Sequence, residues 1–272
     1  MFKRLFAFIF KSKRPTEHNN VAAVTKGSEA SAATPETPPH IQAPYGAAKS
    51  VSRRTTDMNA ESELARFLDE NLYAKLLAEG NFCSIERMTE KEQQLQGIDV
   101  VVKTQSSVGY IDEKAQLYYI NKDIPTFAFE LQFLKNGQVI EGWFLNDDLK
   151  TDHYLLIWPF ASVTDVTMLK KEDFIKLDAL MVSKKKLRET LASLGFDKAT
   201  LVQKAAELRR TRTYGKVPTG TQGIYYYASD SSKYVEAPIN IVISKARLIA
   251  LADARYVITK DGFRRQNQNF NI

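Results

Sequence analysis

The sequence between residues 97 and 120 decides the fold. It consists of a first run, GIDVVVKT (97–104), the short turn QSSV (105–108) and a second run, GYIDEKAQLYYI (109–120). Both runs are rich in β-branched and aromatic residues, which favour strands over helices. Two such runs joined by a short turn predict an antiparallel β-hairpin.

Charged side chains lie inside this predicted hairpin. Because side chains alternate along a strand, Asp112 and Lys114 share one face and Glu113 points to the other. If the two runs pair, Asp99 lies beside Asp112 at one end of the sheet. Two carboxylates so placed repel each other, and a divalent cation relieves that repulsion. Oxygen ligands favour Mg²⁺ or Mn²⁺ over zinc, so we expect Asp99 and Asp112 to bind one of these ions.

The other residues of the sequence exclude several other kinds of chemistry. Cys83 is the only cysteine and the chain has three histidines, so a disulfide framework and a structural zinc site are excluded. The run GKVPTGTQG (215–223) lacks the Lys-Ser/Thr ending of a P-loop, which argues against ATP dependence. A metal held by two acids can polarise a phosphate and lower the pKa of a bound water, while Lys114 orients or deprotonates that water. The sequence therefore predicts phosphodiester hydrolysis.

The order of an acid, a gap and then acid-x-Lys on a hairpin that follows a helix resembles the PD-(D/E)XK nuclease superfamily, which includes restriction endonucleases, resolvases and repair nucleases. The resemblance covers about residues 59–160. It implies that Asp99 and Asp112 are the metal-binding acids, that Lys114 is the catalytic lysine, and that the core runs helix, three strands, helix, strand. The sequence departs from this pattern because Ile98 replaces the nominal proline and because more than three predicted strands precede the next clear helix.

A helix is expected before the hairpin. Apolar residues recur there at helical spacing and stop before Gly80; they are Leu64, Phe67, Leu68, Leu72 and Leu76. Members of the superfamily often add an acid from this helix. Glu61, near the centre of the apolar stripe, is the candidate for a further catalytic residue. An acid in the first turn also favours the helix dipole without any catalytic role.

The rest of the chain alternates between predicted strands and helices. Strands are expected at TFAFELQFL (126–134), EGWFLN (141–146) and DHYLLIWPFA (152–161), in a mostly antiparallel meander of four or five strands. Two or three short helices are expected within KKEDFIKLDALMV (170–182), KKKLRETLASLG (184–195) and KATLVQKAAELRR (198–210), with Ser183 as N-cap and Gly195 as stop. Strands QGIYYYAS (222–229), APINIVIS (237–244) and RYVIT (255–259) follow, with the helix KARLIALAD (245–253) before the last. We predict the α/β class: a restriction-endonuclease-like mixed sheet flanked by helices at 59–272, behind a disordered N-terminal tail.

The formal charge of +6 is unevenly distributed. Residues 1–58 carry nine Lys and Arg against four acids, a net +5, and residues 169–216 carry 13 against six, a net +7. A basic segment beside an acidic body is expected where cations hold a phosphate backbone and carboxylates act nearby, so DNA is the expected partner. A solvated helix face would give the same count. The candidate DNA-binding residues are Lys184, Lys185, Lys186, Arg209, Arg210 and Arg212.

The N-terminal region is predicted to be a flexible basic tail. Residues 15–58 are rich in Ala, Ser, Thr and Pro and form a linker. The longest apolar run, 5–10, is far shorter than the roughly 18 residues needed to cross a bilayer, so we expect a soluble, cytoplasmic protein. Residues 1–14 combine four Phe with five Lys or Arg and could contact a membrane surface, although a disordered end fits equally well.

These features together predict a Mg²⁺-dependent DNA endonuclease. Two alternatives remain open: a non-catalytic module of the same fold that binds nucleic acid or protein, and a membrane-surface protein led by residues 1–14. The nuclease interpretation does not exclude membrane attachment.

Overall fold

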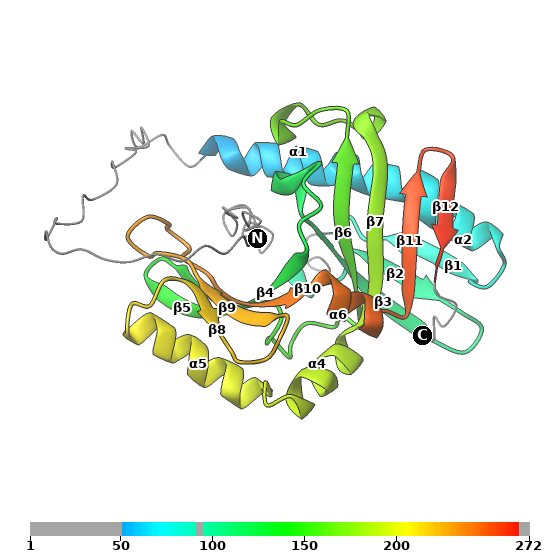
Figure 1. The fold of residues 1–272 in the computed structure, drawn as a ribbon. Helices are drawn as coiled ribbons and strands as arrows, with labels where there is room; N and C mark the ends of the chain where they lie inside the picture. The colour runs from blue at the N-terminus through cyan, green and yellow to red at the C-terminus, as the bar shows by residue number, and fades with distance from the viewer. Residues whose placement is uncertain (1–50, 91–94, 267–272) are drawn as a thin grey trace, which may run out of the picture.

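The computed structural model describes residues 51–90 and 95–266, and the side chains of these ranges from residue 59 onward. Within them the chain forms two β-sheets with flanking helices, a mixed α/β architecture (Figure 1). Residues 1–14, for which a membrane contact was predicted, lie outside the described residues, as does most of the predicted tail.

The first sheet, here called sheet A, has the strand order β1-β2-β3-β6-β7-β11-β12. Its strands are β1 (Ser84–Arg87), β2 (Val100–Lys103), β3 (Val108–Ala115), β6 (His153–Ala161), β7 (Phe174–Ser183), β11 (Ala254–Thr259) and β12 (Gly262–Arg265). β2 and β3 form the predicted antiparallel hairpin, with Val100 opposite Ile111. β3 and β6 are parallel, because the two strands between them in the sequence belong to the other sheet. Sheet A is therefore mixed and differs from the predicted meander.

One face of sheet A is covered by the N-terminal helical segment. Helix α1 (Val51–Leu68) continues through the π-helical turn η1 (Asp69–Tyr73) into α2 (Ala74–Ala78), so it begins eight residues before the expected start near Asn59. The predicted apolar stripe is buried against Val100, Ile111 and Leu155 of the sheet. Figure 1 shows α1 lying across the strands of sheet A.

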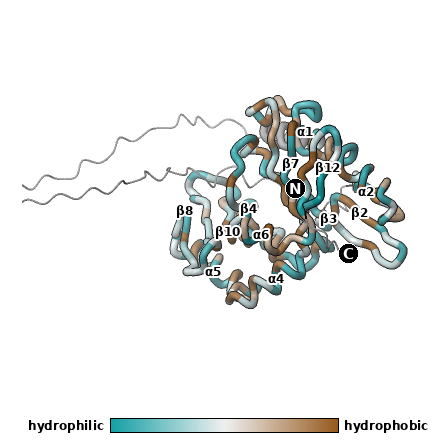
Figure 2. The backbone as a smooth tube through the Cα atoms, turned by 45° about the vertical axis from the view of Figure 1, so that its right-hand side comes forward, coloured by the Kyte–Doolittle hydropathy of each residue, from teal (hydrophilic) through white to brown (hydrophobic). Residues whose placement is uncertain are grey.

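The second sheet, here called sheet B, has the order β5-β4-β10-β9-β8. Its strands are β4 (Thr126–Lys135), β5 (Gln138–Glu141), β8 (Gly215–Pro218), β9 (Ile224–Ala228) and β10 (Ile239–Ser244). Helices α4 (Lys184–Ser193), α5 (Lys198–Arg210) and α6 (Lys245–Leu251) supply apolar side chains to the core that it shares with the other face of sheet A. In that core the rings of Phe127 and Trp158 meet edge to face at 5.3 Å. Figure 2 shows hydrophobic residues along β7, which is buried between the two layers.

Short helical turns connect these elements: η2 (Leu117–Tyr119), η3 (Val166–Met168) and η4 (Lys171–Asp173). The predicted caps of α4 are present, since Ser183 Oγ accepts from the backbone N–H of Lys186 at 3.3 Å and Gly195 adopts a φ of +85°. Within the described residues, no helix is both long and apolar enough to cross a bilayer.

Two predicted elements differ from the structure. Most of the run 170–182, expected to be helical, forms β7, whose residues from 177 to 182 are all buried. A strand buried on both faces has no two-residue alternation, so its sequence cannot be told from a buried helix by periodicity. The expected strand at 141–146 is instead a turn in which Gly142 lies against the backbone of Glu130, where an added Cβ would stand 2.4 Å from the carbonyl oxygen.

Candidate functional site

Strand β3 places its charged residues on opposite faces of sheet A, as the alternation predicts. Asp112 and Lys114 pair in register with Tyr154 and Leu156 of β6, which belong to the core shared with sheet B. Glu113 points to the face covered by α1. There its carboxylate accepts from Tyr73 Oη at 2.7 Å and from two guanidinium nitrogens of Arg87 at 2.9 Å. Glu113 thus ties the hairpin to the π-helical turn.

Asp112 and Lys114 form a buried ion pair. Lys114 Nζ donates to Asp112 Oδ1, and the two residues are 7 % and 2 % exposed respectively. The ammonium also lies 5.1 Å from the centre of the Trp143 ring, whose face attracts a cation. Taking two charges out of water costs several kcal/mol per ion before their attraction offsets it. A buried ion pair is therefore unfavourable in free energy for a strand that has apolar neighbours on either side.

Asp99 reaches the same stretch of β3 through a β-bulge. Its backbone N–H bonds to the carbonyl of Ile111 at 2.9 Å, although Ile111 is already paired with Val100. Asp99, which directly precedes β2, and Val100 therefore both meet Ile111 of β3, and two residues opposite one is the defining feature of a bulge. The bulge turns the Asp99 carboxylate onto the backbone N–H of Glu113, with Oδ2 at 2.9 Å. The carboxylate thus lies beside the peptide group that joins Asp112 to Glu113, and Asp99 is 4 % exposed.

A third acid, Glu130 of β4, lies near this ion pair. Burial raises its pKa to about 8, while a hydrogen bond from the backbone N–H of Trp143 and the charge of Lys114 act in the opposite direction. Glu130 Oε1 is buried without a hydrogen-bond partner among the described residues. Glu130 is not among the site residues predicted from the sequence. Its signal is an acid among the five large apolar residues of the run TFAFELQFL, where a buried charge must be partnered or protonated.

Tyr154 closes the site from the side of β6. Its pKa lies well above the usual value because the phenol is buried and because the negative charge of Asp112 is close. The hydroxyl is buried without a hydrogen bond among the described residues, while the ring meets Trp143 edge to face at 5.1 Å. The site is therefore a small polar cluster walled by aromatic rings.

The structure does not bring Glu61 to this cluster. Glu61 lies on α1, which packs on the face of sheet A that carries Ile111, whereas Asp112 and Lys114 point to the opposite face. Glu61 is partly buried, and its helix lies on the side of the sheet away from the ion pair.

The predicted DNA-binding residues fall into two groups. Lys184 is buried and donates to the carbonyl of Leu149 at 3.0 Å, and Arg209 donates to the carbonyl of Ala237 at 3.0 Å; burial lowers the pKa of each. These two side chains therefore join separate backbone segments through hydrogen bonds. The others lie on the ends of α4 and α5, where Lys185 is 3.8 Å from Glu189 and Lys186 is 3.3 Å from Asp253. Arg210 is the last residue of α5, and Arg212 lies two residues beyond it.

The donor set offers two acids for the predicted Mg²⁺ or Mn²⁺. Magnesium usually keeps several waters and is held by one or two carboxylates, so Asp99 and Asp112 suit it chemically. Across the described ranges, no group of three or more His, Cys, Asp or Glu side chains is arranged to hold a metal. Lys114 already occupies one oxygen of Asp112, so a cation would have to share that carboxylate with the ammonium.

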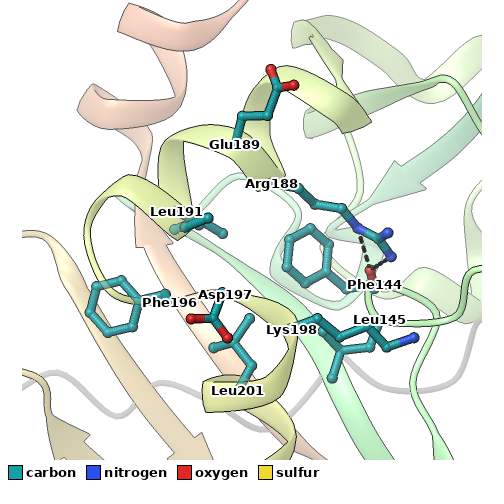
Figure 3. A pocket seen from close by; sticks show the side chains of 10 residues that line it. Phe144, Leu145, Arg188, Glu189, Leu191, Phe196, Asp197, Lys198 and Leu201 are labelled. Carbon is teal, nitrogen blue, oxygen red and sulfur yellow. Dashed lines mark hydrogen bonds between the residues drawn. The ribbon is translucent and has the colours of Figure 1, made fainter.

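A cavity beside this cluster is lined by residues other than Asp99, Asp112 and Lys114 (Figure 3). It has a volume of about 250 Å³ and opens between α4, α5 and the turn after β5, with Phe144, Leu191, Phe196 and Leu201 among its apolar walls. Asp147, beside its rim, receives hydrogen bonds from Lys198 at 2.7 Å and Arg188 at 2.6 Å, which hold the pKa of its carboxyl at about 2. The rim charges thus neutralise one another.

Comparison of the chain with family models, curated proteins and solved structures finds no match. Membership of the PD-(D/E)XK superfamily therefore stays a prediction from the residues of the hairpin.

Proposed function

We propose that the chain is a Mg²⁺-dependent phosphodiester hydrolase that acts on DNA, with its centre at the end of the β2–β3 hairpin. The observation that supports this most directly is the convergence of Asp99, Asp112 and Lys114 on one short stretch of β3. Buried ionisable groups that interact strongly with one another concentrate at functional sites. Elsewhere in a fold, such groups lower the free energy of unfolding without serving a function.

Each residue would have a distinct part in that reaction. Mg²⁺ would supply Lewis-acid polarisation of the phosphate and a more acidic bound water. The Asp99 carboxylate is held in place by the N–H of Glu113, which fixes the direction of its other oxygen. Lys114, held between Asp112 and the Trp143 ring, would stabilise negative charge on the phosphate. Glu130 and these three groups are all buried.

DNA cleavage by the full chain tests this proposal. The substitution Asp99→Asn removes the charge but keeps an oxygen for the Glu113 N–H, so the fold should be retained while cleavage in MgCl₂ or MnCl₂ falls at least 100-fold. Asp178→Asn is the matched control, because Asp178 is also a buried strand carboxylate, held by Arg255 at 2.9 Å. An Asp99→Asn variant as active as the wild type, or a wild type without metal-dependent cleavage, would contradict the proposal.

The second candidate function is a non-catalytic binding module, and the closed state of the site favours it. Asp99, Asp112 and Lys114 are between 2 % and 7 % exposed, and Lys114 already neutralises Asp112. In this case the ion pair is structural and the partner binds elsewhere. Titration with Mg²⁺ followed by calorimetry separates the two functions: the hydrolase binds the ion in a manner abolished by Asp99→Asn, and the module gives no such heat.

A further inference from the structure

Part of sheet A extends beyond the core that it shares with sheet B. The strand register places Trp158, Asp178, Val257 and Arg264 in one row across β6, β7, β11 and β12. Trp158 belongs to the shared core, so this row faces away from α1. Figure 1 shows that side of the sheet towards the viewer, with no described helix in front of the upper parts of β7, β11 and β12.

Four residues on this side of sheet A are accessible to solvent, one from each of four adjacent strands. Phe160 of β6, Lys176 of β7 and Val257 of β11 are partly exposed, and Arg264 of β12 is exposed. Phe160 and Lys176 are register partners in the row next to that of Val257 and Arg264. These four residues are here called the cationic face of sheet A.

The two cations of the cationic face have no acidic partner. Within the described part of the chain, the side chains of Lys176 and Arg264 form neither a hydrogen bond nor an ion pair. The acid in the neighbouring row position, Asp178, is 5 % exposed and is held by Arg255 at 2.9 Å and by Lys245 at 2.8 Å. Its charge is therefore already neutralised. Two positive charges remain on this face, and an anionic ligand complements them.

Phe160 gives the cationic face an aromatic ring. Lys176 Nζ lies 4.0 Å from the centre of that ring, where the ring face attracts a cation. The ammonium ends a flexible side chain, so it can move to a phosphate while a base takes its place on the ring. Proteins bind single-stranded nucleic acid through aromatic rings beside basic residues, because every base has a π-face that can stack. In a duplex the bases are already stacked on one another, so this pairing of a ring with cations favours a single strand.

The spacing of the two cations suits a chain of phosphates. Strand β11 lies between β7 and β12, so the backbones of Lys176 and Arg264 are about 10 Å apart across the sheet. Side chains so separated suit two phosphates of one strand better than a single phosphate group. Asp112 and Lys114 of β3 lie on the same side of sheet A. A nucleic-acid strand on the cationic face would therefore lie on the side of the sheet that carries the ion pair.

We propose that the cationic face of sheet A binds single-stranded DNA, with Lys176 and Arg264 on two phosphates and one base stacked on Phe160. The choice of DNA among polyanions rests on the proposed function, whereas the binding itself needs no metal ion. The contacts on this surface come from strands, in contrast to the helical cations predicted from the sequence.

Fluorescence anisotropy of a labelled oligonucleotide, titrated with the full chain in EDTA, tests this assignment. The probe is a single strand of mixed sequence of about 20 nucleotides, longer than the site of one small binding fold. Lys176→Gln/Arg264→Gln should weaken binding about tenfold and reduce the slope of log affinity against log salt by about 1.4, since each phosphate contact to a single strand contributes about 0.7. Phe160→Leu keeps an apolar side chain without the ring and should weaken binding about tenfold.

Two further variants control for charge and for folding. Arg210→Gln/Arg212→Gln removes the same charge from exposed positions at and just beyond the end of α5 and should leave the affinity nearly unchanged. Lys176→Arg/Arg264→Lys keeps both charges of the cationic face and should bind as the wild type does. A single cooperative transition in the melting curve of each variant confirms that it folds.

Four results would overturn this assignment. They are a wild type that does not bind the oligonucleotide, equal losses of affinity in the two charge-removing variants, a charge-keeping variant that binds as weakly as Lys176→Gln/Arg264→Gln, and tighter binding of the duplex of the same sequence. A wild type that binds the single strand in EDTA but does not cleave DNA in MgCl₂ or MnCl₂ contradicts the proposed function and leaves the cationic face as the binding surface.

Discussion

The carboxylate of Asp99 accepts a hydrogen bond from the backbone N–H of Glu113 at 2.9 Å, so the side chain of the residue before β2 takes the place of a backbone acceptor at the end of the ladder between β2 and β3. This relationship makes Asp99 a structural residue of the hairpin, whatever chemistry the site performs. It also explains why an acid, a poor strand former, is found at the start of a buried strand.

The first prediction concerns this bond. Asp99→Ala leaves the Glu113 N–H without its acceptor and should lower the free energy of unfolding by about 1–3 kcal/mol. Asp99→Asn keeps an oxygen at the same place and should cost less than Asp99→Ala. Urea unfolding, followed by the fluorescence of Trp143 and Trp158, measures both. Equal losses for the two variants would show that the charge, and not the hydrogen bond, is what matters.

The second prediction concerns the ion pair of Asp112 and Lys114. Asp112→Leu alone leaves the buried Lys114 ammonium without its carboxylate and should lower the free energy of unfolding by about 3–5 kcal/mol. Adding Lys114→Met removes the stranded charge, and the double variant should recover most of the loss. A double-mutant cycle from urea unfolding gives the coupling energy. A double variant no more stable than Asp112→Leu would argue that the site is needed for packing and not for charge balance.

The third prediction is a pH dependence caused by Glu130. Burial raises its pKa to about 8 in the folded state from the usual value of 4.5, so the folded state binds the proton more tightly than the unfolded state. The stabilisation is complete below pH 4.5 and is lost as the pH rises to about 8, with a slope of up to about 1.4 kcal/mol per pH unit. Glu130→Gln cannot titrate but keeps an acceptor for Trp143. The free energy of unfolding of the wild type minus that of Glu130→Gln should therefore fall between pH 5 and pH 8, and a flat difference would contradict the raised pKa.

The fourth prediction concerns Asp147, which joins α4 and α5 to the turn beside the cavity through Arg188 and Lys198. The side chain of Asp147 is 60 % exposed, so solvent weakens both ion pairs. Asp147→Asn should cost no more than about 1 kcal/mol, and most of that loss should vanish in 1 M NaCl. Thermal melts at low and high salt measure it. The control is Lys185→Gln, which removes the 3.8 Å ion pair between Lys185 and Glu189 on α4 and should have a smaller effect.

The sequence predicted the elements whose signals are local. The β2–β3 hairpin, the placement of Asp112 and Lys114 opposite Glu113, and the Ser183 and Gly195 caps follow from alternation and capping chemistry, and all are present. Strand β7 was mistaken for helix because both of its faces are buried, which removes the two-residue period.

The arrangement of the strands into two sheets depends on pairings that no local pattern shows. Glu130 is close enough to Lys114 for that charge to lower its pKa, although β4 and β3 belong to different sheets. The separation of Glu61 from Asp112 has the same origin, since the two residues lie on opposite sides of one sheet.

The parallel pairing of β3 with β6 also bears on how the chain folds. Residues 116–152, which include β4 and β5, lie between these neighbours in the sequence. The central ladder of sheet A can therefore close only when a segment that belongs to sheet B has been looped out, and closing that loop costs entropy before the new contacts compensate. Parallel, non-local pairings of this kind form slowly. The two sheets should consequently unfold and refold in a single concerted transition, limited by this one crossover, and neither should survive as an autonomous fragment.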